Sequence, residues 1–504
     1  MAPHIRTVTT ASGARAVQIV YSKRGGKREM DHIGSAHTDA EYELLLAAAR
    51  QKLVAGQQEF DLGLEAPKVS VVPITSSRMG VLWDLLTLAY SKLDFDVVAS
   101  QEDGDVFRRL TLARLIEPTS KLDAARVLEE AGIAAPSYAT LKRRLPMYAD
   151  PAFREGIAAA NADHVGLGPA TICLYDVTTL YFETDQGDGF RESGFSKERR
   201  LEPQITVGLL TDASGFPLMV EAFEGNTAET KTMLPVIEAF MRAHHLTDVV
   251  VVADAGMVSE GNKKALEAAG LSYVLGEKTP QVPSIIRRWR EEHPGEELPD
   301  HAIFIENGPI DPVTGRPRQV RYYRYTQSYA RRTLRGIETQ VEKARAQVEG
   351  RAQVKRNRFV KLEGGSKQVN EELAKKAREL AGIKGYVTNL TGWSPEQVVA
   401  AYHRLYEVEK SFRMSKSDLK ARPIYHHTKD SINAHLTIVF AALAVARWLE
   451  NASGWSIRKL VKTMRRYRTV QIQVGSQIVT AEDPLTEELR AVVDRVRVAG
   501  GALN

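Results

Sequence analysis

The stretch "ATICLYDVTTLYFE", residues 170–183, decides the fold of this chain. Its first eight residues form an apolar run typical of a buried β-strand, and the carboxylate of Asp176 lies within that run. Burying an unpaired carboxylate is costly, so Asp176 needs a partner. That partner is a basic side chain, a set of backbone N–H groups or a metal ion, and the stretch alone leaves the three open.

Length and composition indicate a multi-domain globular protein. The chain has 504 residues, of which 43% are hydrophobic and 26% charged. A single cysteine, Cys173, excludes an internal disulfide and fits a reducing compartment. The net charge of +5 and the pI of about 9.0 point weakly to a polyanionic partner.

Nothing in the sequence predicts a membrane location. The N-terminus, "MAPHIRTVTT", lacks the apolar core of a signal peptide. The longest apolar run, "LTIVFAALAVARWL" at 436–449, is too short to span a bilayer and contains Arg447, so we expect a buried helix there. We therefore expect a cytoplasmic protein.

The N-terminal third divides into two regions. Residues 1–36 alternate and carry turn signals, which predicts a small antiparallel β unit, followed by a helix at 39–55. Residues 77–165 predict a helical block. It contains three short helices in succession, and the last of them is basic, with Lys142, Arg143 and Arg144. This arrangement resembles a helix-turn-helix unit that contacts DNA. Such trihelical units also occur as plain structural elements.

Between 170 and 280 the pattern becomes α/β. A first strand is followed by a hairpin, a helix, a strand, a helix and a strand. The second buried strand, "DVVVVAD" at 248–254, ends in Asp254. In open α/β sheets, the carboxyl ends of strands are where sites are built, although strand-end aspartates also cap helices.

A third carboxylate is expected from a strong helix over 394–416, capped by Ser394. Tyr402, Glu409 and Lys416 are seven residues apart, so they should share one helix face. That face is otherwise apolar and should point at the sheet, whereas Glu407 should be solvated. The alternative for Glu409 is an ion pair with Lys416 or Arg413.

Two strands and a helix that deliver Asp176, Asp254 and Glu409 predict an oxygen-rich site. Mg²⁺ or Mn²⁺ prefers such ligands. Two such ions can activate a water or a 3′-hydroxyl and stabilise the leaving oxygen of a phosphodiester. Asp176 would then bind both ions.

The same residues resemble a known family. "LYDVTTLYFE", "GLLTDASGFPLMVEAFEGNTAE", "VVVADAGMVSEGN" and "YHRLYEVEKSFRMSKSDLKARPIYHH" are similar to motifs of bacterial insertion-sequence transposases of the DDE type, in the branch with a Tyr…Glu…Lys catalytic helix. The resemblance covers roughly 105–450. It implies a ribonuclease H-like fold, that is, a mixed sheet flanked by helices, with a long insertion before the glutamate.

Residue by residue, the resemblance makes Asp176, Asp254 and Glu409 the metal-binding triad for two Mg²⁺ ions. It makes Tyr402 and Lys416 contacts to DNA phosphates near the cleaved end. Where the family often has an arginine, this chain has Leu405. The neighbouring Arg404 lies about 100° round the helix, so Arg413 is the candidate to replace that arginine.

The resemblance further implies binding of terminal inverted repeats, cleavage at the element ends, joining to target DNA, and a homodimer in a synaptic complex on the bacterial nucleoid. We expect five regions: 1–75, a β unit with a helix; 76–165, the helical block; 166–280 with 390–450, the catalytic core; 281–389, the insertion; and 451–504, a basic helix and tail. The alternatives are another metal-dependent nuclease of this fold, a non-catalytic DNA-binding protein derived from a transposase, or a purely structural protein.

The insertion contains a basic, aromatic segment. Residues 316–335 hold seven arginines, four tyrosines and no acid, and neither face of the strand expected at 318–326 is apolar enough for ordinary core. One interpretation is a solvated edge strand guarded by positive charge. We expect instead an arm in which Arg321 and Arg324 bind DNA at the element end.

Overall fold

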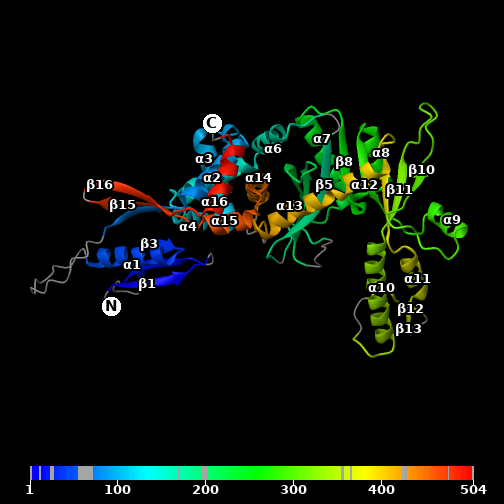
Figure 1. Cartoon of the computed structure of the whole chain (residues 1–504), viewed down its shortest axis with the longest axis horizontal. Coiled ribbons are helices and arrows are strands. Elements are labelled where there is room, and N and C mark those ends of the chain that lie inside the picture. The colour runs from blue at the N-terminus through cyan, green and yellow to red at the C-terminus, as the bar shows by residue number, and fades with distance from the viewer. Residues whose placement is uncertain are drawn as a thin grey trace, which may run out of the picture.

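The computed structural model describes residues 3–10, 13–22, 28–54, 72–168, 171–184, 186–194, 201–353, 357–363, 366–422, 424, 428–474 and 476–501. The molecule is elongated, with the N-terminal unit at one end and the α10–α11 arm at the other (Figure 1). The large sheet lies between the helical block and that arm.

An eight-stranded mixed sheet forms the centre of the fold, in the order β10-β11-β14-β9-β8-β5-β6-β7. The neighbours β5, β8 and β9 are parallel, and all other pairs are antiparallel. The strands of its first half in the chain are β5 (Thr171–Tyr181), β6 (Gln204–Thr211), β7 (Pro217–Glu224), β8 (Val249–Ala253) and β9 (Ser272–Glu277). Strands β5, β6 and β7 are antiparallel, β8 and β9 then run parallel to β5, and helices lie between them in the chain. This order confirms the ribonuclease H-like core.

Side chains along β5 point alternately to the two faces of the sheet. Cys173, Tyr175 and Val177 pack with α7 (Met233–Ala243) and α8 (Glu260–Ala268). Leu174 and Leu180 belong to the other core, which is covered by the helices after residue 394. Since side chains two apart share a face, Asp176 belongs to the side of those later helices.

The predicted N-terminal β unit and the helix that follows it are confirmed. Strands β1 (His4–Thr9), β2 (Arg15–Ser22) and β3 (Arg28–Ala36) form an antiparallel sheet, and α1 (Asp39–Val54) packs on it. The helical block contains α2 (Gly80–Lys92), α3 (Gln101–Ile116), α4 (Ala124–Glu130), α5 (Tyr138–Arg144) and α6 (Pro151–Val165).

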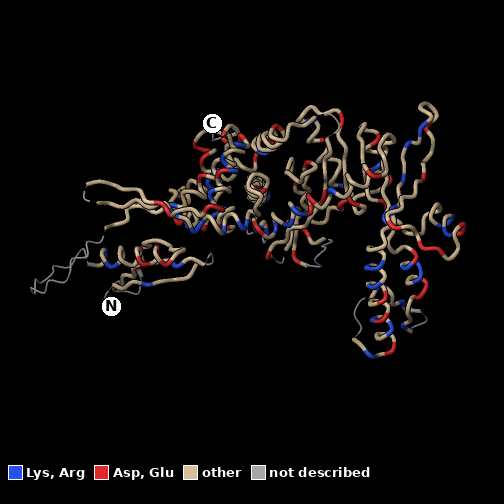
Figure 2. The backbone as a smooth tube through the Cα atoms, in the orientation of Figure 1, with Lys and Arg blue, Asp and Glu red and all other residues tan. Residues whose placement is uncertain are grey.

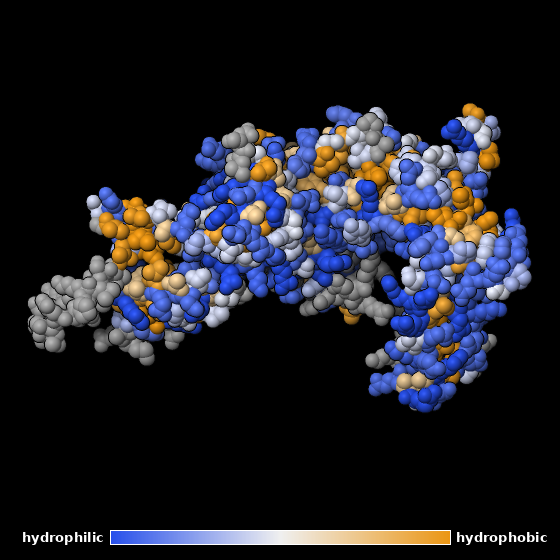
Figure 3. Space-filling model, in the orientation of Figure 1, coloured by the Kyte–Doolittle hydropathy of each residue, from blue (hydrophilic) through white to orange (hydrophobic). Residues whose placement is uncertain are grey.

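The C-terminal region is more than the expected basic helix and tail. It contains α15 (Ile457–Met464), the hairpin β15 (Thr469–Val474) and β16 (Gln477–Glu482), and α16 (Glu487–Ala499). Strand β15 pairs with β4 (Ile74–Arg78), so the two ends of the chain share one small sheet. Figure 3 shows hydrophobic surface over this hairpin, where Val474, Ile478 and Val479 are exposed.

The expected buried helix is α14 (Lys429–Ser453), which is longer than the apolar run that predicted it. By length and composition it is one helix that could cross a bilayer, yet 94% of its most apolar window is buried inside the protein. Helix α14 therefore has the burial of a core helix.

The insertion joins the main sheet and also forms an arm. Its strands β10 (Ile303–Asn307), β11 (Val320–Tyr325) and β14 (Ile383–Thr388) extend the sheet beyond β9. The arm contains α10 (Gln327–Val348), β12 (Val360–Glu363), β13 (Ser366–Val369) and α11 (Glu371–Glu379), and α9 (Ser284–Glu292) lies beside it. Basic and acidic residues alternate along α10 and α11 (Figure 2).

The prediction that neither face of β11 is ordinary core is wrong. Val320, Tyr322 and Tyr323 are at most 6% exposed, and β11 lies between β10 and β14. The edge-strand interpretation fails for the same reason. Tyrosine rings bury well on both faces of a sheet when other strands and helices cover them, which the local sequence did not reveal.

Candidate active site

Asp176 and Asp254 lie side by side because of the sheet register. Strands β5 and β8 are parallel, with Tyr175 opposite Ala253. The residue that follows each of these two is an aspartate, and neighbouring strands are roughly 4.8 Å apart. Val250 and Val252 share the core of Leu174, so alternation places Asp254 on the same face as Asp176.

The expected helix over 394–416 is two helices. Helix α12 (Pro395–His403) begins at a complete capping box between Ser394 and Gln397, as predicted. It ends before Arg404, and α13 (Leu405–Ser417) follows. The seven-residue stacking expected from one straight helix is therefore interrupted between Tyr402 and Glu409.

Glu409 lies at the border of the buried face of α13. The residues that pack inward are Leu405, Val408, Ser411, Phe412, Met414 and Ser415. Glu409 itself is exposed, yet it lines the same cavity as Asp176 of the sheet. Its position in the wall of a cavity does not by itself decide between a metal-binding role and the ion pair that the sequence left open.

A cavity of about 400 Å³ brings the three predicted carboxylates together with Tyr402. The carboxylates come from two adjacent strands and from a helix that covers them. The cavity is lined by Tyr175, Asp176, Asp254, Lys384, Tyr402, His403, Leu405, Tyr406, Val408 and Glu409.

Tyr402 is fixed against Asp254. Its hydroxyl donates a hydrogen bond to Asp254 Oδ1 at 2.6 Å, and its ring meets Tyr386 edge-on at 4.9 Å. Burial, followed by the neighbouring Asp254, raises the pKa of the Tyr402 hydroxyl, so it stays protonated as a donor. A Cβ at Gly276 would lie 2.6 Å from this hydroxyl, so only glycine leaves room for it.

Ion pairs hold α13 in place against α14. Arg447, whose side chain is 3% exposed, meets Glu407 at 2.9 Å and donates to the Ser214 carbonyl. Glu407 is thus a half-buried structural partner rather than the solvated residue that the sequence predicted. Lys410 makes a more exposed pair with Glu450 at 3.3 Å.

The donor chemistry of the cavity fits Mg²⁺ or Mn²⁺, since Asp176, Asp254 and Glu409 offer only carboxylate oxygens. Over the described ranges, however, no three His, Cys, Asp or Glu side chains stand close enough to hold an ion. Tyr402 occupies one oxygen of Asp254. An ion would therefore have to draw the carboxylates closer together than they stand here.

The predicted DNA contacts on the catalytic helices are scattered. Arg404 is exposed at the break between α12 and α13, and Arg413 is exposed on α13. Lys416 is half-buried beside a small, separate apolar cavity, not in the wall of the carboxylate cavity. Leu405, at the position of the family's arginine, is 8% exposed and packs in the core. Residues 423–427, "PIYHH", end the last of the motifs that resemble the family, and of these only Ile424 lies within the described residues.

The other predicted DNA contacts are partly engaged within the protein. Lys142 and Arg143 are exposed on α5, whereas Arg144 pairs with Glu102 at 3.1 Å and with Asp103. Their contact with DNA stays a prediction.

On β11, Arg321 lies 3.5 Å from Glu277, and an Arg324 nitrogen lies 3.0 Å from His301 Nδ1. The expected DNA grip of these two arginines also stays a prediction.

Sequence reasoning missed Lys384, His403 and Tyr406 in the cavity wall. Lys384 is on β14, and its ammonium lies 5.6 Å from the Tyr402 ring centre. Burial, Arg324 and Lys384 lower the pKa of His403. Only the pairing of β14 with β9 brings Lys384 here, and no local pattern signals that pairing.

The sheet and its carboxylate cavity place the chain in the ribonuclease H-like class. Residues 167–445, more than half of the chain, match the family model described as "Transposase DDE domain", and the chain belongs to that family. A search of curated proteins gave no match. Among solved structures, the chain is similar to "Cryo-EM structure of piggyBac transposase synaptic complex with hairpin DNA (SNHP)", with 10% identity, 85% of this chain and 77% of that chain covered, and a TM-score of 0.37.

Proposed function

We propose that this transposase-family protein cuts DNA at the terminal inverted repeats of its own element and joins the freed 3′-hydroxyls to target DNA. One observation carries the proposal: the parallel register of β5 and β8 sets Asp176 beside Asp254, and both line one cavity with Glu409. We further propose that it acts as a homodimer on the bacterial nucleoid, in the cytoplasm.

In this proposal Asp176, Asp254 and Glu409 hold two Mg²⁺ ions, for which Mn²⁺ can substitute. When bound, the ions would activate a water or 3′-hydroxyl and stabilise the leaving oxygen. Tyr402 orients the Asp254 carboxylate through its hydroxyl. Lys384 supplies positive charge at the cavity wall, where a phosphate of the DNA strand would lie.

The test is cleavage of labelled duplex carrying an element end, with Mg²⁺ and with EDTA. Asp176→Asn, Asp254→Asn and Glu409→Gln keep side-chain volume but remove a charge. Each should lower the cleavage rate on the order of 100-fold or more, because even outer-shell partners of a metal cost 10–100-fold. Binding of end DNA should remain.

The matched control is Glu396→Gln, an exposed glutamate on α12 outside the cavity, which should cut at the wild-type rate. Cleavage that persists in EDTA, or in any one of the three amide variants, contradicts the metal site. Cutting without joining indicates a nuclease of the same fold. Binding without cutting by the unaltered protein indicates a non-catalytic descendant, which the separation of the carboxylates in this structure favours as the second candidate.

A further inference from the structure

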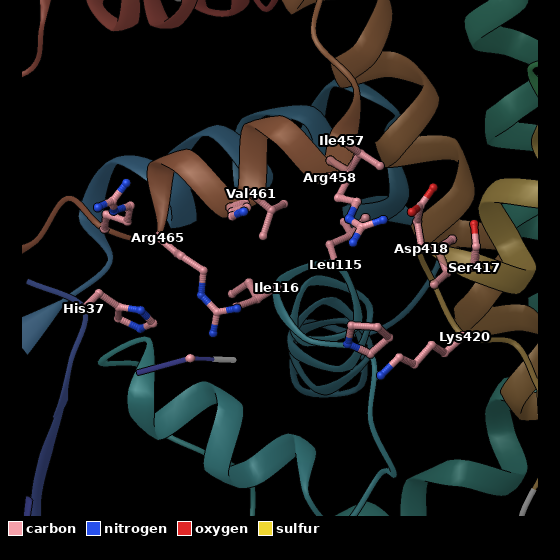
Figure 4. Close-up of a pocket in the computed structure, with 15 residues that line it drawn as sticks. His37, Leu115, Ile116, Ser417, Asp418, Lys420, Ile457, Arg458, Val461 and Arg465 are labelled. Atoms are coloured by element: carbon pink, nitrogen blue, oxygen red, sulfur yellow. The ribbon is translucent and has the colours of Figure 1, made fainter. Parts of the chain in front are cut away.

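At the far end of α13 from the carboxylate cavity lies a second cavity, which we call the basic cleft. Its volume is about 530 Å³, and its walls come from the N-terminal unit, α3, the residues after α13, and α15. Figure 4 shows His37 at one side, Lys420 at the other, and Arg458 and Arg465 reaching down from α15. No predicted site residue lines it.

The charge of the basic cleft is one-sided. Five cations line it, Lys420, Arg458, Lys462, Arg465 and Arg466, against one acid, Asp418. Arg465 pairs with Glu117 at 3.3 Å. Within the part of the chain that the structure describes, no ion pair is formed by the other four cations, all of which are exposed.

Packing of α15 fixes this arrangement. Its buried residues are Ile457, Leu460, Val461 and Met464. With that face held, Arg458, Lys462 and Arg465 follow at spacings of four and three residues along one edge of the helix. Like charges held this close repel one another, so the arrangement is unfavourable unless a polyanion neutralises it.

The basic cleft is in line with the carboxylate cavity. Glu409 and Ser417 are eight residues apart on α13, which corresponds to roughly 12 Å along the helix. Glu409 lines the first cavity and Ser417 the second. Exposed Arg413 lies between them, on the side of Glu409. In duplex DNA, 12 Å corresponds to about four base pairs.

We propose that the basic cleft binds the phosphate backbone of duplex DNA about four base pairs from the bond at the carboxylate cavity. The duplex would follow the exposed side of α13 and reach the N-terminal unit. This inference rests on the proposed function in taking DNA as the substrate and the carboxylate cavity as the place of the cut bond. It assigns α15 and the segment after α13 to DNA binding, apart from the helix-turn-helix-like block and the insertion.

The test compares two triple variants with the unaltered full-length protein. Arg458→Ala/Lys462→Ala/Arg466→Ala removes three charges from the basic cleft. Lys459→Ala/Arg490→Ala/Arg497→Ala removes three exposed charges from α15 and α16 outside it. Affinity for a 40-base-pair duplex is measured over a salt series without metal. The cleft variant should lose about 2 to 3 from the slope of log affinity against log salt, near 0.9 per phosphate contact.

The control triple should keep the wild-type slope and affinity. An equal slope in the cleft variant and the wild type overturns the proposal. If the triple variant fails to fold, Lys462→Ala alone decides, because it should still lower the slope by about 0.9.

A second experiment distinguishes failure of this proposal from failure of the proposed function. A duplex that ends three base pairs past the cut, on the side facing the cleft, should bind the wild type and the cleft variant equally, because it stops short of the cleft. A variant defect that persists on this short duplex overturns the placement. The salt series needs no cleavage, so a protein that cuts nothing still shows whether the basic cleft binds DNA.

Discussion

The carboxylate cavity and the basic cleft lie at opposite ends of α13 and carry opposite charge. The first gathers Asp176, Asp254 and Glu409, and the second gathers five cations around Asp418. In both, the apolar face of a helix is buried and residues at the border of that face contribute charge: Glu409 on α13 in the first, and Arg458 and Lys462 on α15 in the second. The sign of the charge thus changes within about two turns of one helix.

The two cavities differ in how their side chains are held. Sheet register fixes the aspartates, and Tyr402 and Gly276 leave little freedom around Asp254. The cations of the basic cleft are mostly exposed, on α15 or in the segments that follow α13 and α15. We therefore expect all-or-none effects from substitutions in the carboxylate cavity and additive ones in the basic cleft.

Arg447→Met should have the largest effect on both sites, because Arg447 anchors the helix that they share. The substitution removes the buried guanidinium and leaves half-buried Glu407 without this partner, so the free energy of unfolding should fall by about 3 kcal/mol. Denaturant unfolding measures this. Cleavage rate and salt slope should decline together.

Lys410→Met is the matched control, since the Lys410 side chain is 47% exposed. Its loss should stay below about 1 kcal/mol. Equal losses in the two variants would show that Arg447 does not hold α13.

His37, which lines the basic cleft, should make the stability of the protein depend on pH. Burial, followed by Arg465 and Arg468, lowers its pKa to about 4. The unfolded chain therefore binds the extra proton between about pH 6.5 and 4, and the folded protein loses stability as pH falls through that range. From pH 7 to 4.5 the wild type should lose about 2 kcal/mol more than His37→Gln in denaturant unfolding. Parallel pH curves for the two proteins would contradict this.

Tyr402→Phe tests the carboxylate cavity and should have the smallest effect of these substitutions. It removes the hydrogen bond to Asp254 but keeps the ring against Tyr386. A loss of about 1 kcal/mol corresponds to roughly fivefold in cleavage rate, with a raised Mg²⁺ requirement.

Tyr386→Phe is the control for this substitution, because it leaves the hydroxyl on Asp254 in place. A Mg²⁺ titration of Tyr402→Phe that matches the wild type would argue against the positioning role of Tyr402.

Local patterns were sufficient for much of this protein. The strand and helix order over 170–280, the capping box at Ser394 and the three carboxylates followed from periodicity and from hydrogen bonds within a few residues. The same information put Asp176 and Asp254 on two buried strands, and the structure shows that these strands are parallel neighbours.

Tertiary structure decided the rest, because it depends on contacts between residues far apart in the chain. The interior position of β11, the arrival of Lys384 through β14 and the pairing of Arg447 with Glu407 each join segments that no local period connects. The basic cleft is the extreme case, since it brings Gly13 and His37 to Arg466. Sequence by itself predicted the three carboxylates that line one cavity, and packing at long range determined where their charges meet.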